Sequence, residues 1–152
     1  MGKTIATNRK AYHNYHLEGT WECGIALKGG EVKSIRAGFV NFKDSFARIE
    51  DDEVHLYNLH IDPYREASFM NEEPDRVRKL LLHKREIAKM TTKVNERGFV
   101  LVPTKIYFNN RGFVKVELAI GRGKKLYDKR EDVKKRSIDL ALKRSLKSGR
   151  KR

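Results

Sequence analysis

Residues 99–120 carry the pattern that most constrains how this chain folds. From Val114 to Ile120, apolar side chains occupy every second position, which is the period of a half-buried β-strand. Residues 99–108 are rich in β-branched and aromatic side chains, and Asn109-Asn110-Arg111-Gly112 has the composition of a tight turn. The segment therefore predicts an antiparallel β-hairpin.

Shorter strands are predicted earlier in the chain. Trp21–Leu27 is one, closed by Gly29-Gly30. Residues 45–49 and 54–59 flank the acidic run Glu50-Asp51-Asp52-Glu53, so we expect a second hairpin with an acidic turn.

Helices interrupt the strands in a few places. A short one is expected over Glu31–Ala37, between two glycines. Pro74 suits the first turn of another that runs through Leu82, since the missing N–H of proline costs nothing there.

A third helix is expected over Arg85–Arg97, with Ile87, Met90 and Val94 on one face and Gly98 just past its end. Helices that are inserted among short strands, rather than alternating with them, favour a mainly β fold. We expect a small antiparallel barrel like the oligonucleotide-binding (OB) fold. A ferredoxin-like α+β sandwich is the alternative.

Positive charge is concentrated at the C-terminal end. Residues 1–120 contain 20 Lys and Arg against 16 Asp and Glu, a net charge of +4, whereas residues 121–152 contain 14 against 4, a net charge of +10. The second segment has too few apolar residues to offset the entropy of ordering it. We therefore expect a domain over 1–120 and a basic tail over 121–152 that is disordered when free.

The tail nevertheless has a helical pattern. Ile138, Leu142 and Leu146 recur every four residues, and Lys or Arg occupy the other faces. A helix with so narrow an apolar stripe is marginal alone in water, but it can form once phosphates neutralise its cations. A basic tail on a nearly neutral domain is typical of a nucleic-acid-binding arm.

Cations interleaved with aromatic and amide side chains indicate RNA as the partner. They occur near the N-terminus, on the helix expected over 31–37, and after the flexible hinge Gly121-Arg122-Gly123. The candidate RNA-binding residues in these places are Asn8, Arg9, Lys10, Tyr12, His13, Lys33, Arg36, Lys124 and Lys125. Residues 76–85 are basic at both ends as well, and an amphipathic helix with a solvated face is the alternative interpretation there.

The sequence has no recognisable catalytic or metal-binding constellation. His13 and His16 have the spacing of metal ligands, but no Cys or second His pair completes a set. Cys23, the single cysteine, lies in a predicted strand with no cation within two residues, so we expect a buried core side chain. We expect no cofactor, no metal and no enzymatic activity.

The chain also has no uncharged run near the roughly 18–20 residues of a membrane span and no signal peptide. We therefore expect a cytoplasmic protein without a membrane partner. Separately, we expect a monomer.

Five runs occur in an order and at spacings that give a specific resemblance. They are Asn8-Arg9-Lys10-Ala11, Glu22-Cys23-Gly24-Ile25, Gly30-Glu31-Val32-Lys33-Ser34-Ile35-Arg36-Ala37-Gly38, Arg78-Lys79-Leu80-Leu81-Leu82 and Gly123-Lys124-Lys125-Leu126-Tyr127-Asp128-Lys129-Arg130. Together they resemble the bacterial SsrA-binding protein family, SmpB, from about Asn8 into the tail.

The resemblance implies an OB-like barrel that binds the tRNA-like domain of transfer-messenger RNA (tmRNA). It also implies that the protein delivers tmRNA, with elongation factor Tu, to stalled ribosomes for trans-translation. The tail would pass the decoding centre, enter the vacant mRNA channel and fold there as a helix. The nascent chain would then be tagged and the ribosome released.

Two sets of site residues follow from the resemblance. Glu22, Leu81 and the position of His83 match the family's RNA-binding patch, although asparagine is common where this chain has His83. Asp128, Lys129 and Arg130 match the tail motif that the family needs on the ribosome. Four residues of the helix predicted in the tail are expected to act there as well: Ile138, Leu142, Lys143 and Arg144.

Two other classes of protein are compatible with the composition alone. A structural ribosomal protein with a tail threaded through rRNA would copurify stoichiometrically with one ribosomal subunit. An RNA hydrolase is less well supported, because no acid–base pair is visible in the sequence.

Overall fold

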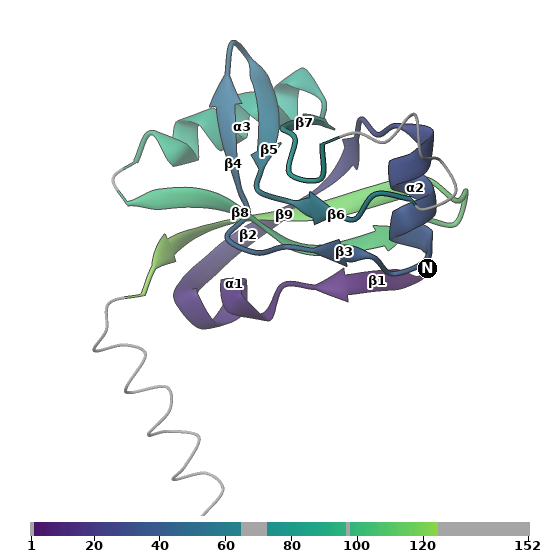
Figure 1. Ribbon diagram of the computed structural model, residues 1–152. Coiled ribbons are helices and arrows are strands. Elements are labelled where there is room, and N and C mark those ends of the chain that lie inside the picture. The colour runs from purple at the N-terminus through teal and green to yellow at the C-terminus, as the bar shows by residue number, and fades with distance from the viewer. Residues whose placement is uncertain (1, 65–72, 97, 125–152) are drawn as a thin grey trace, which may run out of the picture.

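The computed structural model describes residues 2–64, 73–96 and 98–124 (Figure 1). In chain order the elements are β1 (Thr4–Thr7), α1 (Arg9–Asn14), β2 (Tyr15–Ile25), α2 (Gly29–Arg36), β3 (Val40–Asn41), β4 (Phe46–Glu50), β5 (Glu53–Tyr57), β6 (His60–Ile61), β7 (Arg78–Leu81), α3 (Lys84–Val94), β8 (Phe99–Phe108) and β9 (Val114–Gly123).

Strand β8 closes the main sheet into a barrel. The strand order is β1-β8-β4-β5-β7-β2-β9, and β8 also pairs with β9, so the strands from β8 round to β9 form a ring. All these pairings are antiparallel. On the edge of β8 that it shares with β4, the first half pairs with β4 and the second half with β1. The expected small antiparallel barrel is confirmed, and the α+β sandwich is not the fold.

The barrel interior is filled by alternate residues of its strands. Cys23, Leu56, Leu80, Ile106 and Val116 are among the buried members of one apolar cluster. α3 packs on β8 and β9, and α2 stands at the other end of the barrel (Figure 1). Alternation therefore leaves an outer face on each strand that is mostly polar but carries a few exposed apolar side chains such as Leu81, and a surface site can form there.

Both predicted hairpins are confirmed. In the β8–β9 turn, Asn109 Oδ1 accepts the backbone N–H groups of Arg111 and Phe113 at 3.0 and 2.9 Å, and Gly112 has φ 81°. In the acidic β4–β5 turn, Asp51 and Asp52 have φ 51° and 61°, as a type I′ turn requires.

The helix predicted over Pro74–Leu82 is wrong. Residues 78–81 form strand β7, with alternating buried and exposed side chains. Leu80 pairs with both Val54 and Ile25, so the strand fills a gap in the barrel wall. Long-range pairing has outweighed the local helical pattern.

Other boundaries differ by a few residues. β2 begins at Tyr15 rather than at Trp21, and α2 begins at Gly29. α3 ends at Val94, with Asn95 as its C-cap, although Gly98 does take the left-handed conformation at φ 86°. The sequence did not predict β1 or α1.

The described chain ends beside α1. Gly123 pairs with Tyr15, and the Lys124 N–H donates to the Asn14 carbonyl at 2.8 Å. Residues 121–123, where the sequence predicts a flexible hinge at the start of the tail, instead form the end of β9 and pair with β2 and β8. The rest of the tail predicted to be disordered when free, residues 125–152, lies outside the described part. Among the described helices, none is long and apolar enough to span a bilayer.

Candidate nucleic-acid interface

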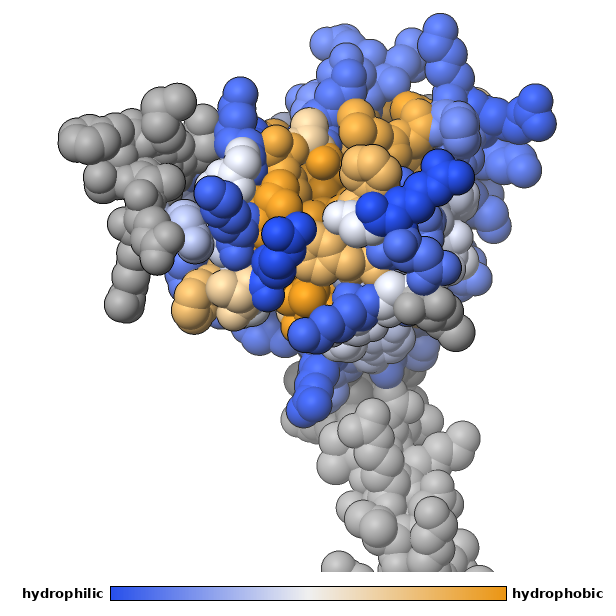
Figure 2. All heavy atoms as spheres, turned by 90° about the vertical axis from the view of Figure 1, so that its right-hand side faces the viewer, coloured by the Kyte–Doolittle hydropathy of each residue, from blue (hydrophilic) through white to orange (hydrophobic). Residues whose placement is uncertain are grey.

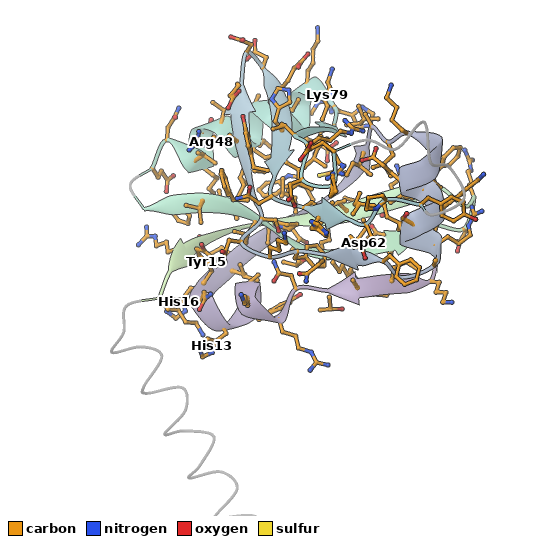
Figure 3. All side chains as sticks on the ribbon, in the orientation of Figure 1. His13, Tyr15, His16, Arg48, Asp62 and Lys79 are labelled. Atoms are coloured by element: carbon orange, nitrogen blue, oxygen red, sulfur yellow. The ribbon has the colours of Figure 1, made fainter. Side chains whose placement is uncertain are left out.

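The candidate RNA-binding residues lie at two ends of the barrel. Four of them are exposed on α1, at the lower left of Figure 3 where His13 is labelled: Arg9, Lys10, Tyr12 and His13. Lys33 and Arg36 are exposed on α2, at the right of Figure 1. The sequence predicts these cations as separate clusters along the chain, and the fold keeps the α1 cluster and the α2 cluster on different elements.

Asn8 differs from its neighbours because its side chain is buried. Its Nδ2 donates to the Pro103 carbonyl at 2.8 Å, and its backbone N–H donates to the Thr104 carbonyl at 2.7 Å. The amide therefore fixes the start of α1 against β8 rather than lying on the surface with the α1 cations.

The two α2 cations each face an aromatic ring. Lys33 Nζ lies 5.4 Å from the centroid of the Tyr64 ring, and the Arg36 guanidinium lies 5.4 Å from that of Phe108. These contacts hold the side chains in place and leave their charge available to an anion. Their contact with RNA stays a prediction.

The outer face of the sheet assembles a third group, which we call the outer-sheet patch: Glu22, Gly24, Leu81, Tyr107 and Lys115. Gly24 pairs with Leu81 on one side and with Lys115 on the other, and Lys115 pairs with Tyr107. Directly paired residues share a face of an antiparallel sheet. Four strands thus present one row of side chains.

Leu81 and Glu22, which the resemblance singled out, meet in this patch. Leu81 is 50% exposed, and its Cβ would lie 3.1 Å from a Cβ placed on Gly24, so the leucine covers the glycine. Glu22 accepts a hydrogen bond from the Tyr107 hydroxyl at 2.5 Å. His83 follows Leu81 by two residues and is exposed at the N-cap of α3.

Sequence reasoning missed Gly24, Tyr107 and Lys115 as site residues. Tyr107 follows the buried Ile106, and Lys115 precedes the buried Val116. Since successive side chains of a strand point to opposite faces, alternation alone predicts that Tyr107 and Lys115 point away from the core. That signal marks outward-facing residues, but it does not say which strands become neighbours.

A cluster of buried charges holds β7 next to α2. The Glu31 carboxylate accepts hydrogen bonds from the Lys28 N–H at 2.8 Å, from Arg76 Nε at 3.1 Å and from Arg78 Nε at 2.6 Å. Arg78 also donates to the Pro74 carbonyl at 3.0 Å. This cluster fixes the strand that carries Leu81.

A groove of about 540 Å³ lies between α1, β4, the end of α3 and the start of β8. Beside it the Phe46 and Tyr57 rings stack with centroids 5.2 Å apart, and the Arg48 guanidinium lies over both. Such rings can stack on bases. Asp44 and Glu50 also line the groove, so its charge is mixed and suits a phosphate backbone poorly.

Cys23 is confirmed as a core side chain. It is fully buried, and burial raises the pKa of its thiol to about 12, so it stays protonated. Among the described residues, no three His, Cys, Asp or Glu side chains gather as metal ligands would.

The face turned to the viewer in Figure 2 has apolar side chains at its centre and hydrophilic side chains around them. This side carries α2 and the β8–β9 turn, where Phe113 is 62% exposed (Figure 1). An apolar centre with a charged rim suits a partner that offers sugar and base surfaces between phosphates.

The remaining predicted site residues lie outside the described part of the chain: Lys125, Asp128, Lys129, Arg130, Ile138, Leu142, Lys143 and Arg144. Lys124, the last described residue, bonds to α1 through its backbone N–H. The root of the tail is therefore fixed beside the α1 cations.

A closed antiparallel barrel with cationic and aromatic surfaces and a strongly basic C-terminal segment defines a small RNA-binding protein. The family model described as SmpB protein matches residues 5–148. The chain belongs to the SmpB family.

Relatives and a solved structure agree with this assignment. SsrA-binding proteins of Caldicellulosiruptor bescii and Thermosipho melanesiensis are 57% and 56% identical over 145 residues, which cover 95% of this chain and 91% and 99% of theirs. A solved structure described as "tmRNA-SmpB: a journey to the center of the bacterial ribosome" is 54% identical with a TM-score of 0.68. The match covers 88% of this chain and 93% of that one.

Proposed function

We propose that this protein binds the tRNA-like domain of tmRNA and delivers it to stalled ribosomes for trans-translation. The barrel grips the RNA, and the basic tail enters the empty mRNA channel beside the decoding centre. Elongation factor Tu reaches the complex through tmRNA. The protein acts as a cytoplasmic monomer and contributes binding and delivery rather than a chemical step.

The observation that carries this proposal is the outer-sheet patch. Glu22 and Leu81 are the residues that the family resemblance selects, and the barrel brings their strands together through the Gly24–Leu81 pair. Membership of the SmpB family and the likeness to a structure described as tmRNA-SmpB support the same partner. These comparisons do not favour a structural ribosomal protein.

The outer-sheet patch suits a folded RNA better than an unstructured single-stranded RNA. It combines one carboxylate, one apolar side chain and one cation, whereas sequence-independent binding needs mainly cations. The basic residues on α1 and α2 lie at the ends of the barrel, where they can hold phosphates on either side. The barrel can thus recognise the shape of the RNA through its phosphates and also contact base edges through the outer-sheet patch.

The test is a binding assay followed by a tagging assay. Anisotropy measurements with the labelled tRNA-like domain should give tighter binding than a scrambled RNA of equal length at the same salt concentration. Extract that lacks the endogenous factor should regain peptide tagging when the protein is added. Equal affinity for both RNAs, or stoichiometric copurification with one ribosomal subunit, contradicts the proposal.

A further inference from the structure

The hydrogen bond between Tyr107 and Glu22 spans a strand. Tyr107 is on β8 and Glu22 on β2, and β9 lies between them. Adjacent strands are about 4.8 Å apart, so the bond bridges a gap of about 10 Å that only a long side chain can cross. Lys105 Nζ lies 5.4 Å from the centroid of the Tyr107 ring, which further fixes the ring.

The phenol can act only as the donor in this pair. Burial, followed by the hydrogen bond to Glu22, raises the pKa of Tyr107 above its ordinary value, so the hydroxyl keeps its proton at physiological pH. The bond occupies Oε2 of Glu22. No other side chain in the described part of the molecule donates to this carboxylate, and Glu22 is exposed.

A carboxylate on an RNA-binding surface needs a particular partner. It repels phosphate, and an ionised carboxylate only accepts hydrogen bonds. The RNA groups that can donate to it are the amino and imino groups of bases and the ribose 2′-hydroxyl.

We propose that Tyr107 is a positioning residue for RNA recognition. By holding Oε2, it aims Oε1 of Glu22 outward to accept a hydrogen bond from a base edge or a 2′-hydroxyl of the bound RNA. The inference rests on the proposed function, and it makes Glu22 a specificity contact rather than a source of electrostatic affinity. Lys115, beside Glu22 in the same patch, is the matching phosphate contact.

The first experiment compares two tyrosine variants. Tyr107→Phe removes the donor and should weaken binding of the tRNA-like domain about threefold to tenfold, as expected for one hydrogen bond. Its salt slope should match the wild type, because no phosphate contact is lost. Tyr57→Phe is the matched control, since Tyr57 donates to Glu50 at 2.6 Å on the β4–β5 hairpin, outside the outer-sheet patch, and the variant keeps the aromatic ring. It should bind as the wild type does.

The second experiment identifies the donor on the RNA. Wild-type protein and Tyr107→Phe are each tested with RNA pools in which scattered nucleotides lack either an exocyclic amino group or the 2′-hydroxyl. One site should interfere with wild-type binding and lose its effect with the variant. Interference in the amino pool assigns a base edge, and interference in the 2′-deoxy pool assigns a ribose.

The outcomes separate this inference from the proposed function. If wild-type protein does not prefer the tRNA-like domain, the proposed function fails. If it does, but a folded Tyr107→Phe binds equally well, the positioning role is overturned. An equal loss for scrambled RNA with a reduced salt slope also overturns it, because that result indicates a phosphate contact.

Discussion

Arg78 on β7 is fully buried, and its Nε donates to Oε2 of Glu31 on α2 across 2.6 Å. The two residues are 47 positions apart. A buried guanidinium without an anion is very costly, so the pair specifies where residues 78–81 must lie. This relationship explains both the strand that the sequence did not predict and the position of Leu81.

Replacing Glu31 with alanine should destabilise the fold strongly. The change leaves Arg78 buried without its anion, and breaking a buried pair in this way costs about 3–5 kcal/mol. Urea unfolding followed by circular dichroism measures the loss. Glu53→Ala is the control, because Glu53 on the β4–β5 hairpin forms an exposed pair with Lys79 of β7 at 3.1 Å, and its loss should leave the midpoint almost unchanged. Similar midpoints for the two variants would refute the assigned role of Glu31.

The Glu31 carboxylate should make the free energy of unfolding depend on pH in the acid range. Burial favours a higher pKa for Glu31, but hydrogen bonds from Arg76, the Lys28 N–H and Arg78 outweigh it, so its pKa lies below the ordinary 4.5. The folded state therefore binds this proton less readily than the unfolded state. The stabilisation is complete above pH 4.5 and is lost as the pH falls through the lowered value.

Glu31→Gln removes this titration while keeping the shape of the side chain. Urea midpoints between neutral pH and about pH 3 should fall more steeply for the wild type than for the variant. Asp75 and Glu53, whose pKa values are also lowered, contribute equally to both proteins. Parallel plots of urea midpoint against pH for the two proteins would show that another titrating group dominates the acid dependence of stability.

Local patterns were sufficient for the two hairpins and not for β7. Alternation over Val114–Ile120 and the Asn109–Gly112 turn describe contacts between neighbours in sequence, and both are confirmed. At 74–82, three consecutive leucines and Pro74 fit a helix locally. The buried Arg78–Glu31 pair and the pairing of Leu80 with Val54 decide otherwise, and neither is visible in a local window.

The candidate site shows the same division. Exposure of Lys33, Arg36 and the α1 cations follows from composition, since charged side chains rarely lie buried. The burial of Asn8 and the bond from Tyr107 to Glu22 depend on which strands become neighbours. Sequence patterns supplied the residue types of the site but not their geometry.

Gly24→Ala should disturb the outer-sheet patch through Leu81. The added Cβ would lie 3.1 Å from Leu81 Cβ, so the leucine must move by a few tenths of an ångström. We expect affinity for the tRNA-like domain to fall several-fold with little loss of stability. Gly19→Ala on the same strand is the control, because its Cβ would meet Ile120 at an ordinary 3.8 Å. Equal affinities for the two variants would remove Leu81 from the interface.

Charge reversal on α2 should change the salt dependence of RNA binding. If Lys33 and Arg36 each contact a phosphate, replacing both with glutamate lowers the slope of log affinity against log salt by about 0.9 per lost contact for a duplex. The double variant Lys89→Glu/Lys93→Glu, at two exposed positions of α3, makes the same change in net charge and is the control. A slope that stays at the wild-type value in the double variant would place these side chains outside the interface.

Truncation after Tyr127 should separate RNA binding from ribosome rescue. The described body ends at Lys124, whose N–H bonds to Asn14, so the truncated chain keeps every described contact. The lost cations supply only nonspecific electrostatic attraction to RNA. Apart from that contribution, affinity for the tRNA-like domain should stay within about twofold of the wild type at physiological salt. Peptide tagging in extract should be abolished, because the segment expected to enter the mRNA channel is missing.

A variant with the tail sequence scrambled at constant composition distinguishes the effect of the tail's charge from that of its apolar pattern. It should also bind the RNA and fail to tag if the stripe of Ile138 and Leu142 forms a helix on the ribosome. Equal loss of RNA binding and tagging on truncation would show that the tail is part of the surface that binds the tRNA-like domain.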